Sequence, residues 1–385
     1  DVLYMTPIFQ SNSCHKYDTT DYYQIDPSFG TTEDLKELVQ KAHERGMKVV
    51  LDAVYNHTGR EFFAFADILE NGEKSKYRDW YFIDGFPLKS EWGEIPNFKC
   101  FGYYGGMPKL NLKNPEVEKY ITDVACYWIK ECDIDGWRLD VGDEISHFFW
   151  KNFRKAVKAV KKDMLIIGEI WHYAGDFLEG DEWDTVMNYP FYLNLIDLLA
   201  DEKITVSQFV QNLGYLKGRL HKNCYPLMWN LIDSHDTARF LHLCNDNKKK
   251  QHLAAAFQLL LPGMPMIYYG DEYAMPGAND PDCRRGMYWD EEYQDKEMYE
   301  WYKRLIQVRK SHACIVEGEL AGSVTEDEEG TIILIRKNGE ETIAMIFNCS
   351  SSAKKFNEYT QKYNLLTENT FDGNVEGFDA AVIVL

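Results

Sequence analysis

Short apolar segments of strand length alternate with helix-period segments along most of the chain. Between Leu35 and Ala42, apolar residues recur at three- and four-residue spacing, after a threonine pair and before Gly46, which is typical of an amphipathic helix. The apolar runs Leu3 to Phe9 and Lys48 to Val54 flank this segment and have the length of strands. This part of the chain therefore predicts a β-α-β unit with parallel strands.

The same alternation continues as far as Tyr269. Asn114 as a cap and Pro115 in the first turn predict a helix that leads into the next strand. The further strand candidates are Gly136–Asp140, Leu165–Glu169, Val186–Asn188, Leu227–Ile232 and Met266–Tyr269, with a helical stretch over Gln251–Leu261. Seven strands are one fewer than the eight of a (β/α)8 barrel. The alternative is a doubly wound open sheet, but no G-x-G-x-x-G turn follows the first strand.

Two regions depart from this alternation. Residues 59–106 are rich in aromatic residues and glycine and have little period, which indicates an inserted subdomain within the barrel. Near the C-terminus the pattern changes to period 2 in Thr331–Arg336 and Thr342–Phe347, which a Lys337–Glu340 turn joins. We expect a catalytic α/β barrel over residues 1–312 and a C-terminal antiparallel β-sandwich domain over residues 313–385.

Charge and cysteine content narrow the partners and the compartment. The chain of 385 residues has 42 basic and 62 acidic side chains, a net charge of −20, which argues against nucleic acid or an anionic membrane surface as a partner. Aromatic residues make up 15% of the chain and offer flat faces for stacking. The nine cysteines include no C-x-x-C pair, so neither a disulfide framework nor a zinc site is indicated, and a reducing, cytoplasmic location is expected.

The N-terminal residues do not decide between a cytoplasmic and a secreted protein. No apolar run reaches the length of a membrane span. The N-terminus lacks both an initiator Met and the basic start of a signal peptide, so we expect the true N-terminus to lie outside these residues. Secretion is therefore not excluded by the sequence.

Polar residues that end the predicted strands are the candidates for chemistry. In a parallel barrel the functional face lies at the C-terminal ends of the strands, and Asp140, Glu169 and Asp236 end or follow three different strands. We expect their carboxylates to converge. Such a group suits glycosidic cleavage, which develops positive charge on the sugar, and Arg138 on the strand face of Asp140 would favour the ionised form of that carboxylate. Metal ligation is the rival use, but no H-x-x-x-H or comparable cluster lies beside these acids.

Four segments then identify a family. Asp52–His57, Gly136–Val141, Gly168–Trp171 and Asp233–Thr237 resemble, in order, the four conserved regions of the α-amylase family, glycoside hydrolase family 13. Three more segments are similar to its neopullulanase, cyclomaltodextrinase and maltogenic amylase subfamily, namely Met107–Asn111, His15–Tyr22 and Asn279–Arg285.

The resemblance implies catalytic roles residue by residue. Asp140 matches the nucleophile that forms a covalent glycosyl intermediate, and Glu169 matches the acid that protonates the leaving oxygen and then acts as a base on water. Asp236 matches the third acid, which binds sugar hydroxyls and helps to distort the ring. Arg138 matches the guanidinium that keeps the nucleophile ionised.

Six further residues match substrate-binding positions of the family. They are Tyr17 as the aromatic platform under the sugar, His57 and His235 as hydroxyl ligands, Asp280 with Arg284 at the far edge of the sugar, and Trp171 on the aglycone side. Phe62, Phe63 and Tyr103 in the inserted segment are candidates for either stacking or core packing. Asp52 is expected to be structural. Asn56 matches a position that ligates calcium in many family members; calcium is left open and no metal ligand is assigned.

The expected activity is that of a retaining hydrolase acting on α-1,4, and perhaps α-1,6, bonds of maltooligosaccharides, cyclodextrins, pullulan or starch. A glucanotransferase or sugar isomerase of the same family is the alternative, and a non-catalytic carbohydrate-binding relative is disfavoured because all three acids are present. The resemblance also implies that the chain begins at the second barrel strand, without the first strand and helix. Subfamily members frequently dimerise, so a homodimer is left open.

Overall fold

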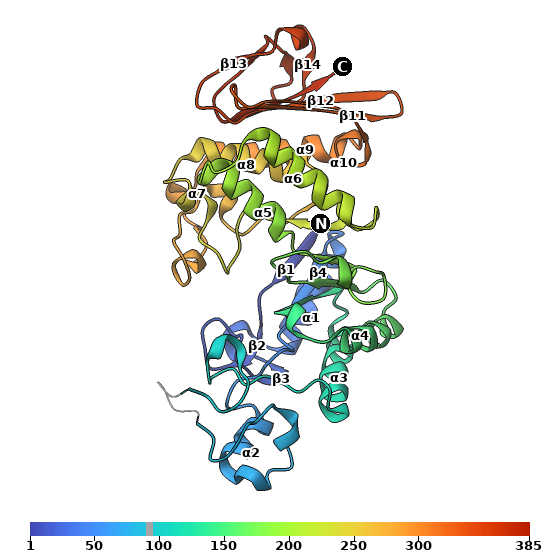
Figure 1. Cartoon of the computed structure of the whole chain (residues 1–385), viewed down its shortest axis with the longest axis vertical. Helices are drawn as coiled ribbons and strands as arrows, with labels where there is room; N and C mark the ends of the chain where they lie inside the picture. The colour runs from blue at the N-terminus through green and yellow to red at the C-terminus, as the bar shows by residue number, and fades with distance from the viewer. Residues whose placement is uncertain (90–94) are drawn as a thin grey trace. The chain divides into compact units, whose positions relative to one another are not determined.

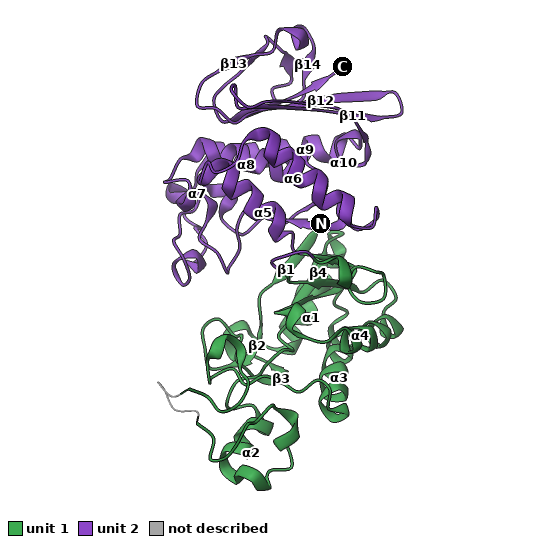
Figure 2. Ribbon diagram, in the orientation of Figure 1, with its two compact units in different colours: residues 1–170, 174–186 green, residues 171–173, 187–385 purple. Residues whose placement is uncertain are grey.

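The structure, a computed structural model, describes residues 1–89 and 95–385 (Figure 1). These residues form two compact units, shown in separate colours in Figure 2. Unit 1 holds residues 1–170 and 174–186, and unit 2 holds residues 171–173 and 187–385. The domain limits expected from the sequence, 1–312, 59–106 and 313–385, stay a prediction, and residues 90–94 of the inserted segment lie outside the described residues.

A five-stranded parallel sheet in the order β1-β4-β5-β6-β7 forms the centre of unit 1. Its strands are β1 (Val2–Met5), β4 (Lys48–Ala53), β5 (Gly136–Leu139), β6 (Leu165–Gly168) and β7 (Thr185–Val186). The helices of this unit are α1 (Thr32–Glu44), α2 (Phe63–Asn71), α3 (Pro115–Cys132) and α4 (His147–Val160). Because helices connect neighbouring parallel strands, the carboxyl ends of all five strands lie at one edge of the sheet.

The helix starts agree with the signals in the sequence. Thr31 caps α1, and its hydroxyl accepts the backbone N–H of Asp34 while the Asp34 carboxylate accepts that of Thr31. Asn114 caps α3 through the backbone N–H of Glu116, with Pro115 as the first helical residue. These local hydrogen bonds satisfy amides that would otherwise lack partners at the helix starts.

The first apolar run does not form one strand as expected. It divides into β1 and β2 (Phe9–Ser11), because Pro7 between them has no N–H to continue a strand ladder. β2 instead pairs antiparallel with β3 (Thr19–Ile25). The connection between these two strands carries Tyr17, one of the predicted site residues.

The inserted segment is anchored by a buried aromatic residue and by backbone pairing. Phe62 precedes α2 and is completely buried. Residues 107–111 then return to the sheet edge, where Lys109 pairs with His57 and Leu110 pairs with Tyr81 in isolated antiparallel bridges. The segment expected from the subfamily resemblance therefore lies directly beside the end of β4.

Unit 2 starts with the remaining parallel strands and their helices. β8 (Trp229–Asn230) pairs in parallel with β9 (Met264–Pro265). The helices are α5 (Tyr189–Leu195), α6 (Val206–Arg219), α7 (Phe240–Leu243), α8 (Lys248–Leu260), α9 (Lys296–Ser311) and α10 (Cys314–Glu317).

The prediction of a strand over Met266–Tyr269 is wrong, because β9 already ends at Pro265. The Met266 N–H still donates to the Asn230 carbonyl at 2.8 Å, but the next residues leave the ladder. There the rings of Tyr268 and Tyr269 lie over the guanidinium of Arg239. Packing of these side chains on a buried cation thus takes the place of further strand pairing.

The C-terminal part of unit 2 is an antiparallel sheet of six strands in the order β10-β11-β12-β17-β14-β15. Its strands are β10 (Glu319–Glu326), β11 (Thr331–Asn338), β12 (Glu341–Asn348), β14 (Tyr363–Asn364), β15 (Asn369–Thr370) and β17 (Asp379–Val384), and β13 (Lys354–Lys355) pairs with β16 (Asn374–Val375). The period-2 hairpin is as expected, with Ile332 and Leu334 in the core shared with α8 and Ile333 in a second core on the opposite face.

Among the described residues, no helix combines the length and the apolar character that crossing a membrane requires. All nine cysteines are free. Burial raises the pKa of Cys132 to about 11 and that of Cys244 to about 12, so both keep their protons at neutral pH.

Candidate active site

A single arginine lies at the centre of the candidate site in unit 1. Arg138 is the third residue of β5 and is completely buried. Its Nη1 donates to both Asp52 oxygens at 3.1 Å and to Asp140 Oδ1 at 2.9 Å, and its Nη2 forms an ion pair with Glu169 Oε2 at 2.9 Å. Three carboxyl groups at the ends of β4, β5 and β6 therefore share one guanidinium.

The first of these carboxyl groups, Asp52, ties the site to two tyrosines. Asp52 Oδ2 accepts hydrogen bonds from the Tyr4 hydroxyl at 2.7 Å and the Tyr17 hydroxyl at 2.9 Å. Burial raises the pKa of Asp52 above its ordinary value, while the Arg138 guanidinium acts in the opposite direction. Burial also raises the pKa of Tyr17, so its phenol stays protonated and remains a donor to Asp52. Asp52 thereby fixes the orientation of the Tyr17 ring.

Backbone geometry places the other two carboxyl groups. Val141, directly after Asp140, has a φ of 47°, and its N–H donates to Glu169 Oε2 at 2.9 Å. Gly168, directly before Glu169, has no room for a side chain, because an added Cβ would lie 2.2 Å from the ring of Trp183. The end of β6 therefore packs directly against the buried side chain of Trp183.

His57 supports the same site from the end of β4. It is buried, and burial lowers its pKa to about 4, so the ring is neutral at pH 7. Its Nε2 donates to the Tyr17 carbonyl at 2.9 Å, and its Nδ1 lies 3.4 Å from Asn56 Nδ2, which fixes the tautomer. In this structure His57 thus holds the backbone of Tyr17, and its predicted contact with a sugar hydroxyl stays a prediction.

The site next to Asn56 does not fit calcium. Lys109 Nζ donates to Asn56 Oδ1 at 2.8 Å and to Glu144 Oε2 at 2.5 Å, so an ammonium group takes the oxygen ligands that a cation would need. Within the described part of the chain, no group of three or more His, Cys, Asp and Glu side chains is arranged to hold a metal ion. The structure therefore supplies its own cation at this position.

The predicted residues of unit 2 form a second cluster. Asp236 has a side chain that is 28% exposed, and His235 Nε2 lies 3.2 Å from its Oδ2. Arg284 Nη2 lies 3.5 Å from Asp236 Oδ1, and Arg284 Nε forms an ion pair with Asp280 Oδ1 at 2.7 Å. The structure brings these four residues together. The predicted convergence of Asp236 with Asp140 and Glu169 involves both units and stays a prediction.

Two buried acids, Asp233 in the segment of Asp236 and Asp271 after β9, belong to one network with Arg239. Asp233 accepts the N–H of Phe240 at 2.7 Å, and Arg239 Nη1 donates to Asp271 Oδ1 at 3.0 Å. Burial, followed by the charge of Asp233, raises the pKa of Asp271 well above its ordinary value, while the Arg239 guanidinium acts in the opposite direction. This network fixes the start of the loop that carries His235 and Asp236.

Trp171 stacks on Tyr189, with ring centroids 3.9 Å apart, and is 40% exposed, so it retains an accessible aromatic face.

The three aromatic residues of the inserted segment that were candidates for either stacking or core packing differ in their exposure. Phe62 packs inside, Phe63 contacts Phe62 and is 42% exposed, and Tyr103 is 93% exposed. Phe62 therefore belongs to the core, whereas Tyr103 is accessible to solvent.

Several residues of these clusters were not identified from the sequence. Asp271 follows the last parallel strand closely, so the rule that selected acids at strand ends would also have selected it. Tyr4 lies inside β1, and Lys109 acts on a residue 53 positions earlier in the chain, and no local pattern reveals such pairing.

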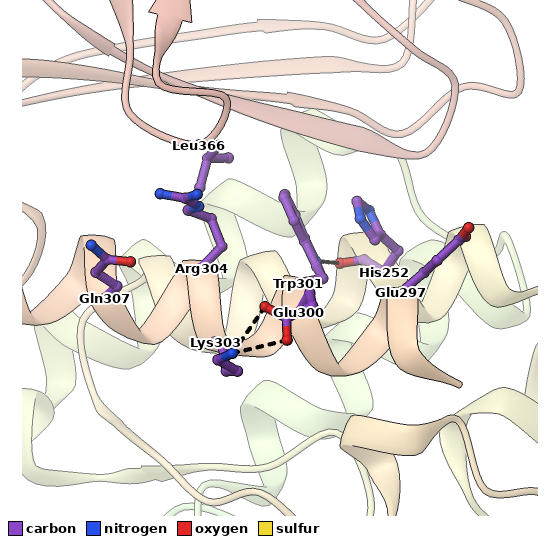
Figure 3. Close-up of a pocket in the computed structure, with 8 residues that line it drawn as sticks. All are labelled: His252, Glu297, Glu300, Trp301, Lys303, Arg304, Gln307 and Leu366. Carbon is purple, nitrogen blue, oxygen red and sulfur yellow. Dashed lines mark hydrogen bonds and ion pairs between the residues drawn. The ribbon is translucent and has the colours of Figure 1, made fainter. Parts of the chain in front are cut away.

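A separate pocket of about 370 Å³ lies along α9 in unit 2 (Figure 3). Four of its polar residues, and the neighbouring Glu368, take part in side-chain contacts. Lys303 Nζ pairs with Glu300, Arg304 pairs with Glu368, and Trp301 Nε1 donates to the His252 carbonyl at 2.9 Å while its ring stacks on the imidazole. No site residue predicted from the sequence lines this pocket, and we assign no chemistry to it.

Comparison with known proteins finds a matching family profile and similar sequences and structures. The profile for the alpha amylase catalytic domain matches residues 1–294. A cyclomaltodextrinase of Geobacillus thermopakistaniensis is 48% identical over 351 residues, which cover 91% of this chain and 59% of the relative. An intracellular maltogenic amylase of Bacillus subtilis is 44% identical over 347 residues, covering 90% of this chain and 58% of the relative.

A solved cyclomaltodextrinase structure superimposes with a TM-score of 0.95 at 39% identity, covering 99% of this chain and 68% of that one. The predicted fold class, an α/β barrel domain followed by a C-terminal antiparallel sheet, is thereby confirmed. The chain spans about three fifths of the length of the curated relatives that it matches.

Proposed function

Because the chain belongs to the α-amylase family, we propose that it is a retaining glycoside hydrolase that cleaves α-1,4 bonds of maltooligosaccharides, cyclodextrins, pullulan or starch. Cleavage of α-1,6 bonds is part of the same proposal. The observation that supports it most directly is the shared guanidinium of Arg138, which bonds both Asp140 and Glu169 at 2.9 Å. Two carboxyl groups from neighbouring strand ends, held in this way, suit a nucleophile and an acid on one glycosidic bond.

In the first step, an Asp140 oxygen attacks the anomeric carbon while the bond to the leaving oxygen breaks. Glu169 gives its proton to that oxygen, and a covalent glycosyl ester on Asp140 results. In the second step, water attacks the same carbon, Glu169 takes the proton of the water, and Asp140 leaves as a carboxylate. Arg138 stabilises the ionised form of Asp140 at the start and at the end of the cycle.

The remaining predicted residues bind the sugar in this proposal. Tyr17 supplies an aromatic platform, and its hydroxyl bond to Asp52 keeps the ring fixed. Asp236, supported by His235 and Arg284, binds the hydroxyls of the sugar whose bond is cleaved. The Asp280–Arg284 ion pair defines the far edge of that sugar, and Trp171 receives the sugar that leaves.

The substitutions Asp140→Asn and Glu169→Gln test the proposal. Each is expected to lower turnover of maltotriose on the order of 10³-fold or more, because each removes a group that bonds to the reacting atoms. The exposed acids Asp163 and Glu73 provide matched controls as Asp163→Asn and Glu73→Gln, which should leave turnover unchanged. Full activity in either active-site variant would contradict the assignment, and a first product with the β anomeric configuration would contradict retention.

Initial rates on γ-cyclodextrin, pullulan and soluble starch determine the preferred substrate. Products longer than maltotriose, formed from maltotriose, would instead indicate transfer to a sugar acceptor, which is the competing glucanotransferase activity. We also propose a cytoplasmic location, supported by nine free cysteines and by the relative named an intracellular maltogenic amylase. A homodimer stays a prediction.

A further inference from the structure

A second groove, of about 350 Å³, lies in unit 2 beside Trp171. It is bounded by the loop residues Trp171 and Tyr173, by α5 and by α6. This volume is at the lower end of the range for small-molecule sites. Unlike the pocket along α9, the groove is lined by a predicted site residue. This residue is Trp171, which follows Glu169 by two positions in the chain.

Two stacks of planar side chains supply residues that line the groove. The first is Trp171 on Tyr189, as described above. In the second, the Arg219 guanidinium lies 3.9 Å from the centre of the Tyr173 ring and 5.2 Å from that of Tyr215. Stacking of this kind presents flat surfaces whose orientation is fixed.

Hydrogen bonds hold the second stack in place. The Tyr173 hydroxyl donates to the Arg219 carbonyl at 2.8 Å, and Arg219 Nη1 donates to the Tyr215 hydroxyl at 3.2 Å. The arginine is thus held by both tyrosines. Tyr215 nevertheless remains 66% exposed, which leaves a large aromatic face in contact with water. This face is accessible to a ligand.

The amide side chains of Asn194 and Asn212 also line the groove. Asn212 Nδ2 donates to Asn194 Oδ1 at 2.8 Å, and Asn194 Nδ2 donates to the Phe209 carbonyl at 3.1 Å. These bonds orient the Asn212 side chain, which is exposed in the groove. The groove therefore combines fixed aromatic faces with fixed amide groups.

This combination suits a glucan better than other ligand classes. A glucose unit has apolar C–H faces that pack on aromatic rings and a rim of hydroxyls that bonds to planar amide and guanidinium groups. An anionic ligand would meet a protein of net charge −20, and the cation nearest to it, Arg219, is already stacked between rings. A protein partner would need an interface of about 1,000 Å² or more, well beyond a groove of this size.

We propose that Tyr173, Asn212, Tyr215 and Arg219 form an outer glucan-binding subsite. It receives the far end of longer chains, beyond the leaving-group sugar at Trp171. This inference rests on the proposed function and adds a chain-length preference to it: the protein should discriminate in favour of oligosaccharides long enough to reach Tyr215.

The test uses Tyr215→Ala, Arg219→Ala and the conservative Tyr215→Phe, with Tyr363→Ala as a matched control. Tyr363 is 48% exposed and lies in the C-terminal sheet, outside the groove. The values of kcat/KM are measured for maltotriose through maltoheptaose, and calorimetry gives the dissociation constant of maltoheptaose for the Glu169→Gln form of each protein. Thermal melting shows whether each variant is folded.

We expect Tyr215→Ala and Arg219→Ala to weaken maltoheptaose binding and to lower its kcat/KM by about 5- to 10-fold, the effect of one lost stacking contact. The kcat/KM for maltotriose should stay within about 2-fold of the parent value, and Tyr363→Ala should behave like the parent. Tyr215→Phe keeps the ring but loses the hydrogen bond from Arg219, so its maltoheptaose binding should lie between that of the parent and that of Tyr215→Ala. Equal losses for both chain lengths, or no loss for either, would overturn the subsite.

Failure of the proposed function would give a different result, because no oligosaccharide would then be cleaved. The calorimetric measurement still decides on the subsite in that case. Binding of maltoheptaose that is weakened by Arg219→Ala supports it, and absence of maltoheptaose binding overturns it.

Discussion

The packing beneath Glu169 allows a sharp test in which no proposed catalytic group is changed. In Gly168→Ala, the added Cβ would lie 2.2 Å from Trp183 Cε3 and 2.4 Å from Cζ3. Ordinary van der Waals contact begins at 3.4 Å, so the two groups must separate by 3.4 − 2.2 = 1.2 Å.

Trp183 has little freedom to supply this movement. It is 1% exposed, its ring stacks on Phe177 with centroids 4.0 Å apart, and it meets the ring of Trp150 edge-on at 6.1 Å. We therefore expect the end of β6 to shift, together with Glu169. A displacement of about 1 Å at a reacting group costs on the order of 10²-fold in rate, and overpacking of a core costs about 1–3 kcal/mol in stability.

Turnover of maltotriose and the thermal melting temperature are measured for Gly168→Ala. The matched control is Gly214→Ala in α6, where an added Cβ meets nothing within 4 Å. The control should retain its turnover and melt at or slightly above the parent temperature, since alanine favours helix. A second substitution, Trp183→Leu, should restore part of the turnover to Gly168→Ala by removing the ring atoms that collide. Parent-like turnover and melting in Gly168→Ala would refute the reasoning.

Two further predictions concern charges elsewhere in the fold. Burial raises the pKa of Asp379 to about 6 from 3.8, so at this carboxyl the folded state binds a proton more tightly than the unfolded state. The contribution of Asp379 to stability is therefore greatest below pH 4 and is lost as pH rises through 6. The variant Asp379→Asn should therefore have a larger free energy of unfolding than the parent above pH 6, and the difference should vanish near pH 4. Denaturant unfolding between pH 4 and 8 measures this difference. A difference that does not depend on pH would contradict the raised pKa. Replacing Lys109 by Met should cost about 1–3 kcal/mol, because it leaves Asn56 Oδ1 without its donor and removes the ion pair of Glu144. The matched surface change Lys119→Met should have little effect. Calorimetric melting measures both, and equal melting temperatures for the two variants would contradict the role of Lys109.

Local signals in the sequence were sufficient for much of the fold. The caps at Thr31 and Asn114 fixed the starts of α1 and α3, since capping depends on residues within one helical turn. The period-2 hairpin in the C-terminal sheet was equally readable, because alternation gives the face of each side chain directly. The strand expected over Met266–Tyr269 failed because its two tyrosines pack on Arg239, a contact with a residue far away in the chain.

In the candidate site too, some features could be predicted from local sequence, whereas others depend on contacts between distant segments. Asp140 and Glu169 could be selected because each follows an apolar strand, and the proximity of Arg138 to Asp140 follows from the two-residue repeat of a strand. That Arg138 also bonds Asp52 and Glu169 depends on the order of three strands in the sheet. The contact of Trp183 with Gly168 likewise joins two segments that no local pattern relates.

The ammonium of Lys109 beside Asn56 has a consequence for how the protein depends on its surroundings. A covalently attached cation has no dissociation equilibrium, so its occupancy does not fall on dilution or when free divalent ions are scarce. Its charge can instead be removed by chemistry on the side chain, because acetylation of a lysine abolishes the positive charge. The junction between the inserted segment and the end of β4 is therefore indifferent to ion supply and sensitive to lysine modification.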